Sequence, residues 1–405
     1  MRVKKFSNKP IEWGSCNSSF MNYVRRSKEY NVRAWHTVAV ALMVILSSML
    51  GTMPADAKKK VISKSDSLQL KIDSIQNVFL SQKLNYDKEN EKAYLKQRYD
   101  TAKLFNLTRQ MFATLGQLDS LDVAKNKKPK YRKKNSEMLD GYRRNLYNGG
   151  NYFLRKGNNK EAFCFYDDYI ECAKKPMFES YNYNETDSLM PQLAFWALVA
   201  AGLQNNHHGV LKHSDLAYKW VRQDQVLQMQ ANAYMSLDSI PQYAQTLRKG
   251  FDYCPSYTYF FNGLVQHYLD REELDSALML CNEALSRDVA SDKNLKKHFS
   301  YSKSGILLKQ QKWDECITVS EEIIVLDSAF SMPYYNIGLC YFSKAEPLSR
   351  QEKKEKRSLL NLSRKYLEIY RDMEPKEKKR WAPLLYKVYF DLNLGKHFRE
   401  MESNL

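Results

Sequence analysis

Residues 261–284, FNGLVQHYLDREELDSALMLCNEA, decide the fold of this 405-residue chain. Both halves of the stretch carry apolar residues three, four or seven positions apart: Phe261, Leu264, Val265 and Tyr268, then Ala277, Cys281 and Ala284. This is the spacing of one apolar face on a helix. The polar run Arg271-Glu272-Glu273 separates the halves. The stretch therefore predicts two antiparallel amphipathic helices joined by a short turn.

The same pattern recurs along the chain. Counting back 34 residues from the first half gives Leu227, Ala231 and Tyr234, followed by Tyr243, Leu247 and a closing Pro255. Later copies contain Ser304-Gly305 as a close-packing pair, then Trp313, Cys316 and Ile317, and then Tyr334, Ile337, Gly338 and Tyr341. Weaker copies begin near Leu146, Leu193 and Trp381, and the copy at Leu193 has a degenerate second helix near Leu216. Scarce Gly (14) and Pro (11) also favour helices.

In series these copies resemble the tetratricopeptide repeat (TPR), a 34-residue helix-turn-helix module, of a bacterial exported type. Tyr243 departs from the resemblance, because it stands where the family has Ala. The resemblance implies an all-α, right-handed α-solenoid of TPR-like repeats over residues 140–405. Residues 58–139 fit the repeat poorly and predict a helical cap of divergent repeats or a self-association region.

The first 57 residues differ from the rest. A basic stretch precedes the apolar run Val38–Leu50, and Ala55-Asp56-Ala57 follows it. This order is typical of an export signal. The alternative is an uncleaved anchor over residues 34–53, which is long enough to span a bilayer. Both interpretations predict a bacterial cell envelope protein, most simply a periplasmic one.

Charge and chemistry limit the function. The net charge is +17, and +12 without residues 1–57, which favours acidic partners or surfaces. An exported chain does not predict nucleic acid as the partner. No catalytic motif, phosphate-binding glycine loop or metal-ligand spacing is found, so we expect no enzyme, cofactor or metal. His207, His208 and His213 form the one histidine cluster, and we expect all three to be solvent-exposed. Six cysteines follow residue 57; we expect buried free thiols, with Cys281, Cys316 and Cys340 on apolar helix faces.

In the resembled family, partner peptides lie in a groove lined by each unit's first helix. Carrying those positions over gives the candidate groove residues Tyr147, Asn151, Arg155, Gln228, Asn232, Tyr259, Asn262, Gln266, Tyr335, Phe342, Tyr386 and Tyr389. We therefore expect a non-catalytic scaffold that binds a protein or peptide. The alternatives are a binding protein for an acidic glycan or peptidoglycan, and an inner-membrane-anchored assembly factor. Two insertions interrupt the repeats: residues 174–190 predict a surface loop, and residues 345–362 predict a solvated helix or a docking element.

Overall fold

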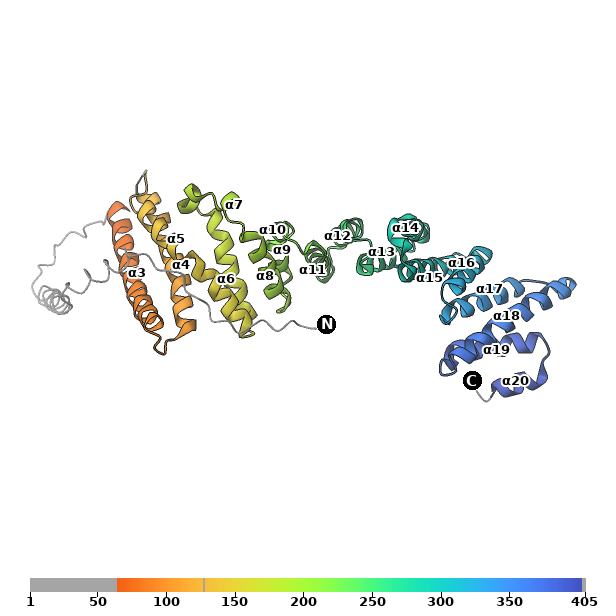
Figure 1. Cartoon of the computed structure of the whole chain (residues 1–405). Helices are drawn as coiled ribbons and strands as arrows, with labels where there is room; N and C mark the ends of the chain where they lie inside the picture. The colour runs from red at the N-terminus through yellow and green to blue at the C-terminus, as the bar shows by residue number, and fades with distance from the viewer. Residues whose placement is uncertain (1–63, 127, 403–405) are drawn as a thin grey trace, which may run out of the picture. The chain divides into compact units, whose positions relative to one another are not determined.

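The computed structural model describes residues 64–126 and 128–402, and all regular elements in these ranges are helices (Figure 1). The predicted leader, residues 1–57, lies outside the described residues. The chain divides into two units, Met1–Ser67 and Leu68–Leu405. Among the described helices, none combines the length and the apolar character that a membrane span requires. The prediction of an all-α fold is confirmed.

The α-helices follow one another along the chain. In order they are α3 (Lys64–Tyr94), α4 (Thr101–Lys125), α5 (Arg132–Arg155), α6 (Asn159–Glu171), α7 (Tyr183–Thr186), α8 (Met190–Gly202), α9 (His207–Lys212), α10 (Ser214–Ala217), α11 (Gln223–Ser236), α12 (Ile240–Tyr253), α13 (Thr258–Asp270), α14 (Leu274–Ser286), α15 (Lys293–Lys309), α16 (Trp313–Leu326), α17 (Met332–Ala345), α18 (Lys353–Met373), α19 (Lys378–Asp391) and α20 (Gly395–Glu402). Short 3₁₀ helices are η2 (Cys172–Lys174), η3 (Pro176–Tyr181), η4 (Asp288–Ser291) and η5 (Arg350–Glu352).

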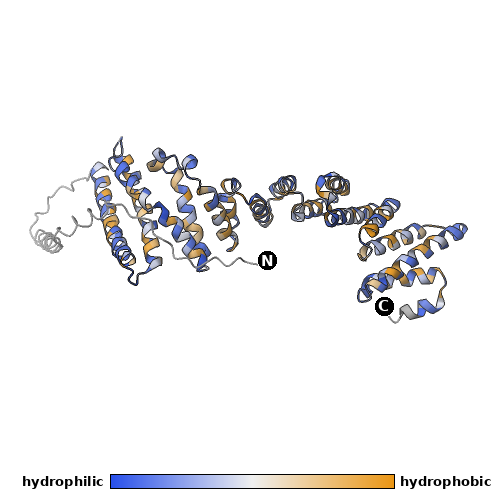
Figure 2. Ribbon diagram, in the orientation of Figure 1, coloured by the Kyte–Doolittle hydropathy of each residue, from blue (hydrophilic) through white to orange (hydrophobic). Residues whose placement is uncertain are grey.

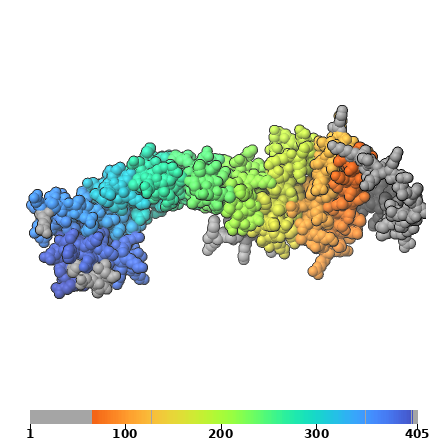
Figure 3. Space-filling model, turned by 180° about the vertical axis from the view of Figure 1, so that it is seen from behind, coloured from red at the N-terminus to blue at the C-terminus, as the bar shows by residue number. Residues whose placement is uncertain are grey.

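Helices of Leu68–Leu405 pack on their neighbours in sequence. The tight pairs include α5 with α6, α11 with α12, α15 with α16 and α17 with α18. Successive pairs are joined in turn by contacts such as α6 with α8 and α12 with α13. The colours of the molecular surface in Figure 3 accordingly follow the order of the sequence. Since residues 261–284 fall within the pair α13 and α14, the predicted repeat unit is confirmed.

The core lies between the helices of each pair and between neighbouring pairs. Figure 2 shows apolar and polar residues on different sides of the helices. In the middle of the array Phe251, Phe260, Phe261 and Phe299 are fully buried in one apolar cluster. Large buried rings of this kind supply most of the apolar area that leaves water on folding. Cys281, Cys316 and Cys340 are buried, as predicted.

A left-handed residue ends the first helix of most pairs. Six such residues have φ between 53° and 73°: Gly157, Asn205, Asp238, Glu272, Gln311 and Asn393. In each case the following backbone N–H bonds back to a carbonyl inside the helix, as Glu273 N does to Tyr268 O at 2.9 Å. This is a Schellman-type helix end, in which glycine is the usual residue because it has no Cβ. Five of the six positions are not glycine, so the turn repeats without a glycine signal in the sequence.

Glycines allow paired helices to approach closely at several points. A Cβ on Gly150 would lie 2.4 Å from the Tyr166 ring, and one on Gly250 would lie 2.3 Å from the Phe260 ring. Gly305 was expected to be such a position, and that expectation is wrong. A Cβ there would meet nothing within 4 Å; the close contact belongs to Ser304 alone, which is fully buried.

Residues 174–190 were expected to form a surface loop, and that expectation is wrong. The segment folds into η2, η3 and α7 and buries Met177, Phe178 and Tyr183. Arg143 of α5 holds it in place, because its guanidinium lies between the rings of Tyr169 and Tyr183, 3.8 and 3.7 Å from their centroids. Arg143 Nη1 also donates to Asp187 Oδ2 at 2.6 Å. A cation–π sandwich with a short ion pair fixes the segment against the array.

The second insertion forms η5 and the start of α18. Residues 351–355 are exposed, and Leu360 is the first buried residue of α18. This matches the predicted solvated helix. Because α18 is lengthened, its Leu360 and Leu367 join Phe342 in the same apolar cluster.

Candidate peptide-binding surface

Two predicted groove asparagines are held by hydrogen bonds from neighbouring helices. Tyr259 of α13 donates its hydroxyl to Asn232 Oδ1 of α11 at 2.6 Å. His298 of α15 lies with Nε2 2.7 Å from Asn262 Oδ1 of α13, and an amide oxygen only accepts, so the ring nitrogen donates. The hydrogen bonds therefore link α11, α13 and α15, the first helices of three successive pairs.

Two glutamines extend this set along the same helices. Gln228 precedes Asn232 by four residues on α11, and Gln266 follows Asn262 by four residues on α13. Residues four apart share one face of a helix. We call the resulting set the amide surface; it consists of Gln228, Asn232, Tyr259, Asn262, Gln266 and His298. The structure thus brings together five of the twelve predicted groove residues.

The amide surface is mainly polar and uncharged. Asn232, Asn262 and Gln266 are exposed, whereas Tyr259 is half-buried. Burial lowers the pKa of His298, so its ring is neutral near pH 7. Burial also raises the pKa of Tyr259 to about 12, which keeps its hydroxyl protonated. A surface of this kind offers hydrogen-bond donors and ring area, with Gln266 already donating to the Asp270 carboxylate at 2.6 Å.

Each held asparagine presents a free amide donor. The carboxamide Oδ1 of Asn232 or Asn262 is occupied by its neighbour, while the Nδ2 group still has two N–H donors. Such donors suit the carbonyl oxygens of an extended polypeptide. Because the neighbouring helix already fixes each amide plane, less side-chain entropy is lost on binding.

The candidates on α5 form a smaller group, nearer the N-terminus. Tyr166 of α6 donates its hydroxyl to Asn151 Oδ1 at 2.7 Å, so this asparagine is held from the second helix of its own pair and not, like Asn232, from the next pair. Arg155 is exposed, and Tyr147 is half-buried. This group therefore also holds an asparagine by its Oδ1, through a different helix, and adds one cation.

The C-terminal candidates divide into two kinds. Tyr335 and Tyr386 are half-buried, and Arg380 lies 5.8 Å from the Tyr335 ring centroid. Phe342 and Tyr389, at 7% and 1% exposure, belong to the core and are not available to a partner. Their assignment to the groove was wrong, because the lengthened α18 adds apolar residues that cover Phe342, and Glu368 accepts the Tyr389 hydroxyl at 2.8 Å.

Sequence reasoning missed two residues of this region. His298 was not a candidate, because the link to Asn262 spans 36 residues and departs from the 34-residue interval. Tyr257, whose ring stacks on Tyr259 with centroids 5.9 Å apart, lies just before α13. The pattern Tyr-x-Tyr at a helix start was the available signal for the second.

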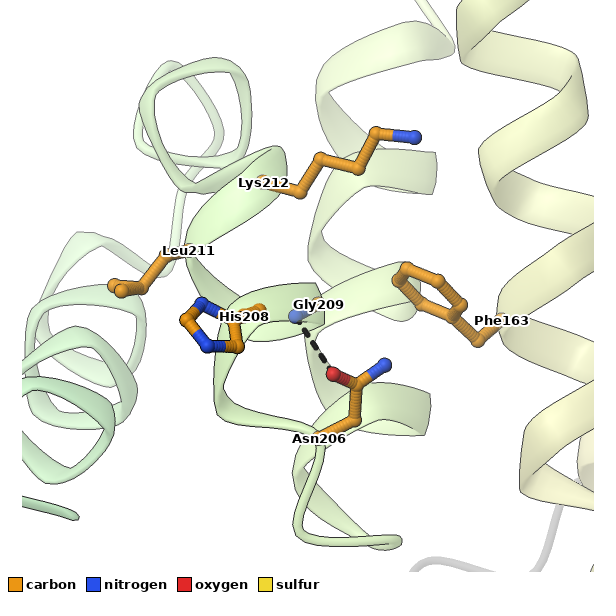
Figure 4. Close-up of a pocket in the computed structure, with 6 residues that line it drawn as sticks. All are labelled: Phe163, Asn206, His208, Gly209, Leu211 and Lys212. Atoms are coloured by element: carbon orange, nitrogen blue, oxygen red, sulfur yellow. Dashed lines mark hydrogen bonds between the residues drawn. The ribbon is translucent and has the colours of Figure 1, made fainter. Parts of the chain in front are cut away.

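The histidine cluster belongs to α9 and the residue that follows it, and none of its three histidines is part of the amide surface. A hollow of about 560 Å³ is lined by Phe163, Asn206, His208, Gly209, Leu211 and Lys212 (Figure 4). Asn206 accepts the Gly209 N–H at 2.9 Å and so caps the start of α9. His208 is exposed, but His213 is only 4% exposed, so the expectation of three solvent-exposed histidines is wrong for His213.

Comparisons with known proteins give structural likenesses only. No protein-family model and no curated protein matches the chain. A crystal structure of the C-terminal part of a TPR repeat-containing protein from Cytophaga hutchinsonii is 11% identical; the match covers 63% of this chain and 92% of that one, with a TM-score of 0.43. MamA (residues 41 to the end) from Desulfovibrio magneticus RS-1 is 14% identical over 45% of this chain and 95% of its own, with a TM-score of 0.35. YrrB, described as a TPR protein with an unusual peptide-binding site, is 14% identical over 49% of this chain and 92% of its own, with a TM-score of 0.34. The fold assignment rests on the helix pairs themselves.

Proposed function

We propose that this protein is a non-catalytic scaffold of the bacterial cell envelope that binds an extended peptide segment of a partner protein on the amide surface. The observation that carries the proposal is the hydrogen-bonded chain from Asn232 through Tyr259 to α13, and from Asn262 to His298 on α15. Both asparagines are exposed, and their Nδ2 donors lie on successive first helices. The envelope location rests on the basic and apolar pattern of residues 1–57.

The composition of the surface favours a peptide over an acidic polymer. A polymer of that kind is bound mainly by lysine and arginine, and its binding weakens as salt screens the charges. None of the six residues of the amide surface is lysine or arginine. Aromatic area from Tyr257 and Tyr259 and neutral amide donors instead give binding that persists in salt.

The test places a photo-crosslinking amino acid at residue 266 and, in a control chain, at residue 361. Asn361 is an exposed residue of α18, outside the amide surface. In intact cells we expect position 266 to give a defined crosslinked protein and position 361 to give none. A synthetic peptide from the crosslinked segment then serves for affinity measurements.

The double substitution Asn232→Ala and Asn262→Ala should lower the affinity for that peptide about tenfold or more, since each lost donor to a backbone carbonyl contributes about 1 kcal/mol. Asn361→Ala is the matched control and should leave the affinity unchanged. Equal affinity in both variants would place the binding site elsewhere. Loss of binding at high salt in the unmodified protein would favour the acidic-polymer alternative. Amino-terminal sequencing of the protein from the periplasmic fraction tests the proposed location.

A further inference from the structure

Two carboxylates and a histidine meet at the most irregular point of the repeat array. Asp167 and Glu171 are four residues apart on α6, so they share one side of that helix. His213 lies between α9 and α10, where φ of −119° interrupts the helix. The interruption turns the His213 ring toward α6, where Nε2 lies 2.6 Å from Asp167 Oδ1.

The three side chains offer donor atoms at the spacing of a metal site. His213 Nε2 is 3.9 Å from Glu171 Oε1, and one donor atom from each of the three residues lies within 4.8 Å of the others. A tetrahedral zinc ion with ligand bonds of about 2.1 Å separates its donor atoms by roughly 3.4 Å. The observed separations lie on both sides of that value, so shifts of about 1 Å bring all three donors onto one ion.

A cation already occupies this position. Lys212 Nζ lies 2.5 Å from Asp167 Oδ1 and 3.6 Å from Glu171 Oε1. Lys174 Nζ also lies 2.9 Å from Glu171 Oε1, so two ammonium groups face the two carboxylates. The pKa of Asp167 is lowered despite its burial, because His213 and Lys212 stabilise the charged form. The Lys212 side chain is 41% exposed and lines the open hollow of Figure 4. It can therefore turn into solvent and leave the carboxylates to an ion.

The donor set selects the class of metal. One imidazole with two carboxylates suits zinc and related transition ions. Calcium and magnesium prefer six or more oxygen ligands, which these three residues do not supply. His213 is nine-tenths buried, and this places one ligand on a fixed, water-excluded support.

We propose that Asp167, Glu171 and His213 bind a zinc-class divalent ion, and that such an ion displaces Lys212 and Lys174 from the two carboxylates. This site is separate from the amide surface and does not depend on peptide binding. Bound metal joins α6 to the interrupted helix α9–α10. It thereby stabilises the repeat unit whose second helix departs most from the TPR pattern.

The experiment titrates the full-length, tag-free protein with Zn²⁺ by calorimetry and with Co²⁺ by visible absorption. We expect one ion per chain and Co²⁺ bands of tetrahedral intensity. Glu171→Gln and His213→Ala should each lower the affinity for Zn²⁺ by more than roughly 10- to 100-fold, which is the loss caused by removing a residue that only hydrogen-bonds to a ligand. Lys212→Met should tighten Zn²⁺ at least about tenfold, because a positive charge next to the ion is removed.

The control is the double variant His207→Ala and His208→Ala, which should bind Zn²⁺ as the unmodified protein does. Circular dichroism establishes that each variant is folded. The proposal is overturned if neither the unmodified protein nor Lys212→Met binds Zn²⁺ saturably. It is equally overturned if folded Glu171→Gln and His213→Ala keep the original affinity, since the ion then binds at other residues, such as the cysteines.

Discussion

Two glycines inside helices of the array should respond oppositely to replacement by alanine. Gly250 of α12 faces the fully buried ring of Phe260, and Gly305 of α15 faces open space. Replacement of a helical glycine by alanine favours the helix by about 1 kcal/mol in both cases. The difference between the two sites therefore isolates the cost of the close helix contact.

The structure sets the size of that cost. An alanine Cβ at position 250 would lie 2.3 Å from two atoms of the Phe260 ring and 2.6 Å from a third. Carbon atoms pack best about 3.5–4.0 Å apart, so ring and helix must separate by more than about 1 Å. Overpacking of this kind costs about 1–3 kcal/mol, and three clashing ring atoms place it at the upper end. We expect Gly250→Ala to destabilise by about 1–2 kcal/mol and Gly305→Ala to stabilise by about 0.5–1 kcal/mol.

Urea unfolding followed by circular dichroism gives the midpoints of both variants. Because repeat arrays unfold in part locally, hydrogen exchange of peptides from α12 and α13 is measured as well. Protection there should fall in Gly250→Ala and stay unchanged in Gly305→Ala. A Gly250→Ala protein as stable as the original, with unchanged exchange in α13, would refute the packing of α12 on α13 described above.

Two further predictions concern the helix ends and the ion pairs. Glu272→Gly and Gln311→Gly should each raise the free energy of unfolding by about 1 kcal/mol, because both residues have a left-handed φ, 59° and 58°. Gly157→Ala should lower the free energy of unfolding by a similar amount, because Gly157 has a φ of 73° with open space around it. Urea midpoints that move the other way would contradict this. Hydrogen bonds from Arg248 are the main reason why the pKa of Glu283 falls from 4.5 to about 2. The stability that this pairing contributes is complete above about pH 4.5 and is lost as the pH falls toward 2. Thermal melts of Glu283→Gln should therefore match the original protein near pH 2 and be lower near pH 7, and a difference that does not depend on pH would exclude the linkage.

The regular helices could be predicted from the sequence because their cause is local. Apolar residues such as Phe261, Leu264 and Tyr268 recur at helical spacing, and burial of that face determines the fold. The helix ends carry no such signal. Asp238 and Glu272 adopt a left-handed φ that glycine usually supplies, so the polar run at Arg271 to Glu273 placed one turn and the 34-residue interval placed the other.

The contacts that escaped prediction join residues far apart in sequence. Arg143 fixes the segment 174–190 through Asp187, 44 residues away, and His213 meets Asp167, 46 residues away. Neither distance follows from a 34-residue repeat. Phe342 was misplaced for a related reason: a frame taken from regular repeats cannot show that an inserted, lengthened α18 covers it.

Departures from the repeat separate the two proposed sites. A partner that is itself a repeating backbone requires donors on successive, equivalent helices, and such helices occur where the pairs are regular, from α11 to α15. There Asn232 and Asn262 repeat one arrangement with hydrogen bonds to different donors, Tyr259 and His298. A metal ion requires instead that different groups converge on one point, and this occurs where the helix breaks at His213. Regular repeats thus favour an extended ligand and the irregular unit a compact one. Substitutions on the amide surface should accordingly leave Zn²⁺ binding intact, and Glu171→Gln should leave peptide binding intact.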